Sequence, residues 1–141
     1  MSTLQNNDLR VADVMLGVER FPVVPPTMFL KQALEEMSKW RLGIVCIRQE
    51  DGSLAGIFTD GDVRRQLLSM QKPFSAFFSD DVIDHATTTP TVTLDTAPLI
   101  EAVGIMEDKQ IWDLPVINAS GKLVGLLHLH PVVKLLIGDG A

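Results

Sequence analysis

Residues 52–58, GSLAGIF, decide the fold, because residues 121–127, GKLVGLL, repeat their pattern 69 positions later. Both glycines and the apolar positions keep their spacing. On both sides of these stretches the same offset relates, without a gap, Val23/Val92, Thr27/Thr96, Leu30/Leu99, Ala33/Ala102, Met37/Met106, Val63/Val132 and Leu67/Leu136. A collinear set of this kind indicates a tandem duplication. Upstream, residues 13–15 (DVM) match residues 81–83 (DVI) at an offset of 68, which predicts a one-residue indel.

Each copy predicts the element order β-α-β-β-α. A short strand precedes an amphipathic helix, for which Thr27 and Thr96 are the expected N-caps. A strand, a glycine turn and a second strand then form a hairpin, and a last helix follows. The expected ranges are 23–24, a helix from about 30, 44–47, 54–58 and 62–70 in the first copy, and 92–94, a helix from about 99, 114–117, 123–127 and 131–137 in the second.

The fold class expected is α+β, with repeat 1 at residues 10–70, a linker at 71–79 and repeat 2 at 80–138. Each repeat is too small for a stable core of its own, so we expect the two to pack sheet to sheet with pseudo-two-fold symmetry. Phe74, Phe77 and Phe78 have helical spacing, and either anchor the connection between the repeats or feed a dimer contact.

Composition excludes several classes of protein. The chain of 141 residues is 46% hydrophobic and 21% charged, which excludes a disordered regulator. Its net charge of −6 and the lack of a basic stripe argue against nucleic-acid binding. Its most apolar stretch, 123–138, is interrupted by charge and proline, and no signal peptide opens the chain, so we expect no membrane partner and a cytoplasmic location. The single cysteine, Cys46, lies in an apolar run and is expected to be a buried hydrophobe.

The stretch with the clearest chemistry is residues 56–65, GIFTDGDVRR, where an apolar strand enters a polar turn that opens a helix. Helix amides and dipole favour an anion there. The Thr59 hydroxyl can donate to a phosphate, the Asp62 carboxylate can accept from the vicinal hydroxyls of a ribose, and the arginines that follow can bind phosphate. Gly61 would let the backbone approach a ligand closely. The alternative is structural: Asp62 caps the helix and Thr59 ends the strand.

The duplicated unit, ending in strand-Gly-h-h-Thr-x-x-Asp-h, resembles a CBS-domain pair, or Bateman module, over about residues 10–137. The wording of 56–65, with GLLHLH at 125–130, resembles the C-terminal CBS pair of the arabinose-5-phosphate isomerase family of sugar-phosphate isomerases. Sugar-1-phosphate nucleotidyltransferases with CBS pairs are a second possible parent. In the CBS family the threonine and aspartate of this motif contact nucleotide phosphate and ribose, which implies these roles for Thr59 and Asp62.

The resemblance implies a regulatory module, not an enzyme, with no required cofactor and no catalytic residues. Its expected ligand is AMP, ATP or a CMP-linked sugar acid. Its expected partners are a second CBS pair in a homodimer and a sugar-isomerase domain, attached or associated, that lies outside this chain. The alternative is a structural dimerisation module with a vestigial site. By family analogy, backbone near 23–25 and 43–45 supplies the base pocket. The candidate ligand-binding residues are therefore Thr59, Asp60, Gly61, Asp62, Arg64, Arg65, Val24, Pro25, Gly43, Val45, His128 and His130.

The second copy departs from the motif, because residues 128–131 read HLHP where the first copy has TDGD. It lacks the ribose-binding carboxylate, so we expect one competent site per chain. His128 and His130 alternate on a strand and would project from one face. Three roles are open to them: strand-end residues with ordinary hydrogen bonds, residues that contact a ligand or an interface, or half of a metal site. Because the sequence offers no third metal ligand, no metal is expected. His85 is expected to be a solvated loop residue.

Overall fold

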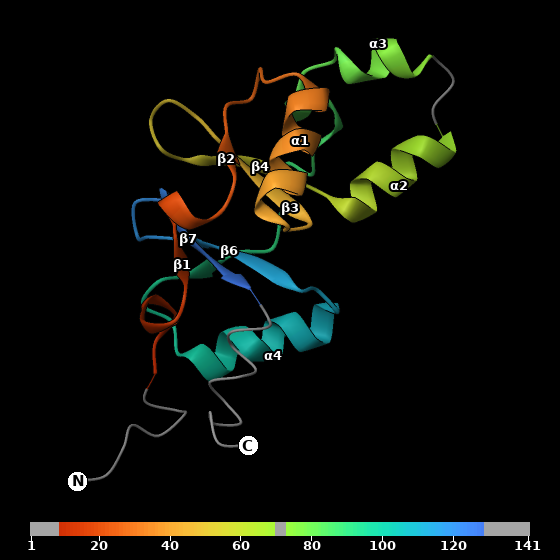
Figure 1. The fold of residues 1–141 in the computed structure, drawn as a ribbon. Coiled ribbons are helices and arrows are strands. Elements are labelled where there is room, and N and C mark those ends of the chain that lie inside the picture. The colour runs from red at the N-terminus through yellow and green to blue at the C-terminus, as the bar shows by residue number, and fades with distance from the viewer. Residues whose placement is uncertain (1–8, 70–72, 129–141) are drawn as a thin grey trace, which may run out of the picture. The chain divides into compact units, whose positions relative to one another are not determined.

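The structure is a computed structural model in which residues 9–69 and 73–128 are described. The chain divides into two compact units (Figure 1). One, the continuous unit, runs from Glu19 to Pro90. The other, the split unit, combines the residues up to Val18 with those from Thr91 onward. The chain therefore alternates between units and does not change unit at the predicted linker.

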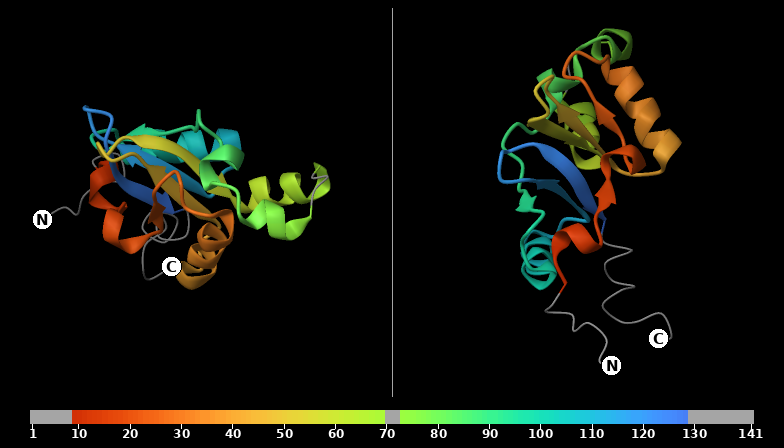
Figure 2. Two further views of the ribbon diagram at one scale, coloured as in Figure 1. Left: turned by 90° about the horizontal axis from the view of Figure 1, so that it is seen from above. Right: turned by 90° about the vertical axis from the view of Figure 1, so that its left-hand side faces the viewer.

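The continuous unit has a three-stranded sheet in the order β2-β3-β4. Strand β2 runs parallel to β3, and β3 and β4 form an antiparallel hairpin. Helix α1 packs against β3 (Figure 2). The elements are β2 (Val23–Val24), α1 (Leu30–Trp40), β3 (Ile44–Arg48), β4 (Leu54–Thr59), α2 (Asp60–Ser69), α3 (Phe74–Phe78) and the 3-10 helix η4 (Val82–His85).

The split unit has a four-stranded sheet in the order β1-β7-β6-β5. Its β5-β6 pair is parallel, and β6-β7 is an antiparallel hairpin. Strand β1 adds to the free edge of β7, antiparallel to it. The elements are the 3-10 helix η2 (Val11–Asp13), β1 (Leu16–Gly17), β5 (Thr93–Leu94), α4 (Leu99–Lys109), β6 (Asp113–Ile117) and β7 (Leu123–His128); a further 3-10 helix, η3 (Val18–Arg20), connects the units.

The duplication explains why both units repeat the same local structure. The hairpin turns place Gly52 at φ 92° and Gly121 at φ 81°, a conformation that favours glycine. Each first helix buries one apolar stripe, with Leu30, Ala33 and Met37 in α1 and Leu99, Ala102 and Met106 in α4. These stripes pack on the hairpin strands and form the two cores. The predicted α+β fold with two repeated sheets is confirmed.

The predicted N-caps of these helices are wrong. The N-cap residues are Phe29 and Pro98, which lie two residues after Thr27 and Thr96 and make no side-chain cap bond. The N-terminal amide of each helix instead donates to a carbonyl of a distant segment: Leu30 to Asp80 at 2.8 Å and Leu99 to Leu9 at 2.8 Å. A tertiary backbone bond therefore replaces the local hydroxyl cap.

Those distant segments, residues 9–17 and 80–87, are the leading segments of the repeats, and each completes the sheet of the other repeat. Val11 N donates to Ala97 O at 2.9 Å, and Val82 N donates to Met28 O at 2.8 Å. Leu16 pairs with Leu126, and Thr87 pairs with Ile57. The acceptors are related by 69 positions, but the leading residues are related by 71. The predicted offset of 68 is therefore wrong. It aligned residues of similar type, whereas the backbone hydrogen bonds show that Val11 and Val82 occupy equivalent positions.

Glycine permits these close approaches. A Cβ at Gly56 would lie 2.6 Å from the backbone oxygen of Thr87. A Cβ at Gly125 would meet the Met15 sulfur and would lie 2.8 Å from the backbone oxygen of Leu16. The two glycines are equivalent in the duplication, and each admits the leading segment of the other repeat.

The remaining fold predictions have mixed outcomes. Helix α2 begins two residues earlier than expected, at Asp60. Phe77 is buried in the core of the continuous unit, which favours its anchoring role, and Cys46 is buried as expected. The expected helix at 131–137 lies outside the described residues. The repeat boundaries and the packing of the two sheets against each other stay predictions. Within the described part of the chain, no helix is long and apolar enough to span a membrane.

Candidate functional site

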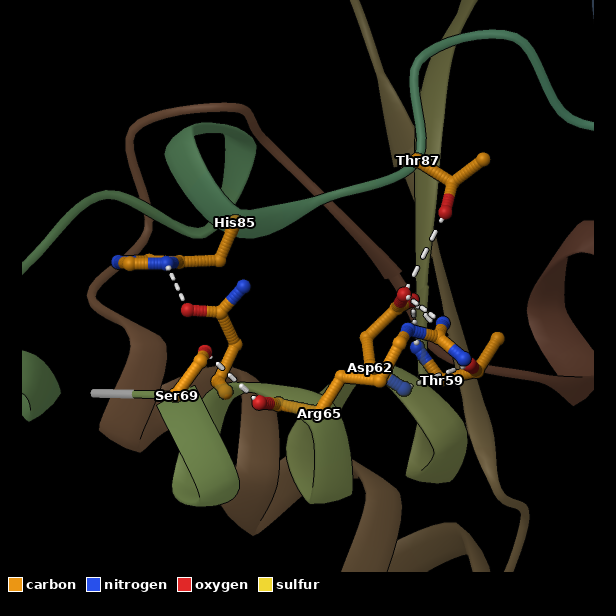
Figure 3. A network of polar contacts seen from close by, with 7 residues as sticks. Thr59, Asp62, Arg65, Ser69, His85 and Thr87 are labelled. Atoms are coloured by element: carbon orange, nitrogen blue, oxygen red, sulfur yellow. Dashed lines mark hydrogen bonds and ion pairs between the residues drawn. The ribbon is translucent and has the colours of Figure 1, made fainter.

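The junction of β4 and α2 is fixed by reciprocal hydrogen bonds between Thr59 and Asp62 (Figure 3). The Thr59 amide donates to Oδ2 of Asp62 at 2.9 Å, and the Asp62 amide donates to Oγ1 of Thr59 at 3.3 Å. The Thr59 hydroxyl also lies 3.1 Å from Oδ2. This is a capping box, in which the N-cap and the third helical residue satisfy each other's orphan amides. The structural alternative therefore describes local roles that Thr59 and Asp62 do have: Thr59 ends β4, and Asp62 takes part in capping α2.

The Asp62 side chain is only 8% exposed, yet both of its oxygens have partners. Oδ1 accepts from Nη2 of Arg65, one helical turn further on, and from Oγ1 of Thr87 at 3.4 Å. Figure 3 shows the Thr87 side chain reaching toward the carboxylate from outside the helix. A buried carboxylate is tolerated only with such compensation. The junction therefore holds one buried carboxylate that accepts hydrogen bonds from several donors.

Gly61 keeps the first turn of α2 open. A Cβ on Gly61 would lie 3.5 Å from Nη1 of Arg65 and 3.6 Å from Oγ1 of Thr59, so both donors converge on this glycine. The Asp60 amide donates to Gly43 O at 3.0 Å, and the Asp62 amide is used by Thr59. Two of the helix amides that could bind an anion are thus engaged, and the side-chain donors beside Gly61 are the Thr59 hydroxyl and the Arg65 guanidinium, both of which bond to Asp62.

Asp60 and Gly43 lie together on the α1 side of the junction. A Cβ on Gly43 would collide with the Asp60 carboxylate, so the two residues are in close contact. They open onto a cavity of about 380 Å³ between the end of α1 and the start of α2, lined by Leu34, Met37, Ser38, Arg41, Leu42, Gly43, Asp60 and Val63. Apolar side chains form most of its wall, and Arg41 and Asp60 supply opposite charges.

Val24 and Pro25 lie at the other end of the sheet. Val24 pairs with Ile47, whereas Thr59 pairs with Ile44. At about 3.3 Å per residue, the three positions from Ile44 to Ile47 separate these ends by about 10 Å. Val24 and Pro25 line a separate cavity of about 390 Å³ beside the β3-β4 turn. Val45 is fully buried in the core, where its side chain supports the sheet and is not accessible to a ligand.

Of the remaining candidates, Arg64 is exposed and makes no side-chain hydrogen bond or ion pair to any residue that the structure describes. It lies about 100° around the helix from Arg65. His128 ends β7, and its Nδ1 donates to Oδ1 of Asp113 at 2.8 Å across the hairpin. His130 lies outside the described residues. Among residues 9–69 and 73–128, no group of three or more histidine, cysteine and acidic residues is placed to hold a metal ion.

Sequence reasoning missed Thr87 and misjudged His85. The His85 side chain is 15% exposed and lies between Oδ2 of Asp80, at 2.7 Å, and Oε1 of Gln66, at 3.1 Å. Its ring packs edge-on against Phe77. The solvated-loop prediction is therefore wrong, because η4 folds onto the continuous unit. Both residues could have been found only from the exchange of leading segments, which the 68-residue offset obscured.

The fold and junction together define a class of protein, a tandem pair of small α+β repeats with a polar strand-to-helix turn in the first. The family model for the CBS domain matches residues 11–69 and 80–137, and the chain belongs to the CBS domain family. The predicted resemblance is confirmed.

Relatives and solved structures extend this result. Arabinose 5-phosphate isomerase KdsD of Pseudomonas aeruginosa is 38% identical over 127 residues, which are 89% of this chain and 37% of that protein. KdsD of Escherichia coli is 31% identical, with the same coverage. The chain thus spans well under half the length of these relatives. The crystal structure of CBSX2 in complex with AMP matches with a TM-score of 0.81 and 26% identity, over 94% of this chain and 98% of that one.

Proposed function

We propose that the chain is a regulatory module that binds an adenosine nucleotide at the β4-α2 junction. The observation that carries the proposal is the buried Asp62 carboxylate beside the Thr59 hydroxyl and the Arg65 guanidinium. A carboxylate suits the two hydroxyls of a ribose, and a hydroxyl and a guanidinium suit a phosphate. The complex of the similar CBSX2 with AMP supports an adenosine ligand.

Asp62→Asn tests the site. The amide keeps the shape but turns one acceptor oxygen into a donor, so we expect AMP to bind about 10- to 100-fold more weakly, from the loss of about 1.5–3 kcal/mol in charged hydrogen bonds. Titration calorimetry with AMP, ATP and a CMP-linked sugar acid on the wild type ranks the candidate ligands. Asp108→Asn, the same change of charge on the exposed face of α4, is the control. No binding of any of the three by the wild type would contradict the proposal.

We further propose that this module regulates a sugar-phosphate isomerase domain. The support is the identity to KdsD, of which the matched region is 37%. The relatives favour this parent over a sugar-1-phosphate nucleotidyltransferase. The test is to supply the module's ligand to the whole protein and to measure aldose–ketose isomerisation of arabinose 5-phosphate. A rate that does not respond to a ligand the module binds would exclude regulation by this route.

A role in self-association is the second candidate, and one observation favours it. Leu67 and Leu68 on α2 are 47% and 81% exposed, which is unusual for two adjacent large apolar side chains. Sedimentation of the wild type and of Leu68→Gln tests this role. A dimer that Leu68→Gln dissociates supports it, and a wild-type monomer at all concentrations contradicts it.

A further inference from the structure

The protein's own donors use both oxygens of the Asp62 carboxylate. Oδ2 accepts from the amide and hydroxyl of Thr59, and Oδ1 accepts from Arg65 and, at 3.4 Å, from Thr87. A ribose needs lone pairs of the same carboxylate for its two hydroxyls. The ribose can therefore bind fully only when one of the internal donors moves away.

Three donors make the shorter bonds to the carboxylate, namely the amide and the hydroxyl of Thr59 and the guanidinium of Arg65, and of these the guanidinium is the one that can move away. The Thr59 amide belongs to the capping box of α2 and is held by the backbone. The Arg65 side chain, in contrast, is 68% exposed and hangs on a flexible stem. Water can replace Asp62 as the partner of the exposed guanidinium, and the hydroxyls of a ribose would replace Arg65 as donors to the buried carboxylate.

Arg65 also lies where a phosphate would bind. Its Nη1 and Nη2 would be 3.5 Å and 3.7 Å from a Cβ on Gly61, and Oγ1 of Thr59 would be 3.6 Å from the same point. The guanidinium thus faces both the buried carboxylate and the open first turn of α2. Its five donors allow it to leave Asp62 for a phosphate without losing its charge-assisted bonds.

We propose that Arg65 is the residue that makes this site selective for nucleotides over nucleosides. Before a ligand binds, Arg65 neutralises Asp62; when a nucleotide binds, Arg65 turns to the phosphate and releases the carboxylate for the ribose. A nucleoside must displace Arg65 and offers it nothing in return. The inference rests on the proposed function, because it concerns the regulation of the same site.

The test is to compare adenosine and AMP on wild type and Arg65→Gln by titration calorimetry. Loss of a charged hydrogen bond to phosphate is expected to weaken AMP binding by about 10- to 100-fold. Loss of the competing ion pair is expected to leave adenosine binding equal or up to about fivefold tighter. The preference for AMP over adenosine is therefore expected to fall, because AMP binds more weakly while adenosine binds as tightly as before or more tightly.

Two further variants separate contact from charge. Lys31→Gln removes the same charge from the exposed face of α1 in the same unit, away from Asp62, and is expected to keep the preference for AMP largely intact. Arg65→Lys keeps the charge but loses the two-pronged geometry, and is expected to give an intermediate preference. Melting curves show whether each variant folds.

The outcomes distinguish this inference from the proposed function. A wild type that binds neither AMP nor adenosine defeats the proposed function and this inference with it. If the wild type binds AMP but Arg65→Gln changes AMP and adenosine by the same factor, the proposed function stands and the selectivity role of Arg65 is overturned. An equal loss of preference in Lys31→Gln also overturns it, since general charge would then suffice.

Discussion

The last strand of each repeat ends at an equivalent position, but the two ends differ in chemistry. Thr59 at the end of β4 faces the apolar Ile44, whereas His128 at the end of β7 faces Asp113. Both pairs are related by 69 positions. Thr59 can therefore turn to Asp62 and cap α2, while His128 and Asp113 bond to each other across the hairpin. The polar partner of the first strand end lies in the helix that follows it, whereas that of the second lies on the neighbouring strand.

The leading segments, in contrast, make the same contacts in both repeats. The bonds Val11–Ala97 and Val82–Met28 have nearly the same length, 2.9 Å and 2.8 Å. Both valines are fully buried. The duplication therefore preserves the contacts made by backbone and core, and varies the polar side chains at the strand ends.

The largest effect is expected for Gly56→Ala. The new Cβ would lie 2.6 Å from a backbone oxygen, so the Thr87–Ile57 bridge must shift or break. We expect a loss of about 2–4 kcal/mol of unfolding free energy by urea denaturation. Gly125→Ala should cost less, about 1–3 kcal/mol, because part of its clash is with the flexible Met15 thioether. Equal stability of both variants and wild type would show that close approach to the leading segments does not require glycine at these positions.

The variants Val11→Ala and Val82→Ala test which repeat each leading segment stabilises. Each removes buried methyl groups, and each is expected to cost about 1–3 kcal/mol. Hydrogen exchange should show that Val11→Ala weakens the protection of α4 and β7, while Val82→Ala weakens that of α1 and β4. Loss of protection within the repeat that follows each valine along the chain would contradict the exchange.

The polar pair of the second repeat should contribute modestly. A double-mutant cycle with His128→Ala and Asp113→Ala is expected to give a coupling energy of about 0.5–1.5 kcal/mol, because the bond is only partly exposed. The matching cycle with Thr59→Ala and Ile44→Ala should give no comparable polar coupling. Similar couplings in both repeats would erase the difference between the strand ends.

The smallest effect is expected for Gly104→Ala, which is the control for the substitutions at the two closely packed glycines. Among residues 9–69 and 73–128, nothing apart from the helix's own backbone and the chain neighbours lies within 4 Å of a Cβ at this position in α4. Alanine should therefore raise the unfolding free energy by about 0.5–1 kcal/mol. Destabilisation here would mean that the losses at Gly56 and Gly125 do not report close packing.

Much of this fold was predictable, because the 69-residue repeat aligned two independent copies of the same periodic pattern. The strands around Gly52 and Gly121 and the stripes of α1 and α4 lie close to where the pattern placed them. The Thr59–Asp62 junction was also predictable, because its capping bonds are local in sequence. Long-range pairing was not predictable in this way. The roles of Thr87 and His85 and the true offset of the leading segments were therefore missed. Val24 and Pro25 were grouped with Gly43 by analogy, whereas the parallel register of β2 and β3 separates them.

The exchange of leading segments also sets an order in which the chain can fold as it is synthesised. All of residues 19–90 leave the ribosome as one continuous piece, so the partners of Val82 and Thr87 are already available when these residues emerge. Residues 9–17 emerge before this piece, yet Ala97 and Leu126, which they pair with, emerge after it. Residues 9–17 must therefore wait without their partners until the whole continuous unit has been made, so the split unit can close only after the continuous unit is complete.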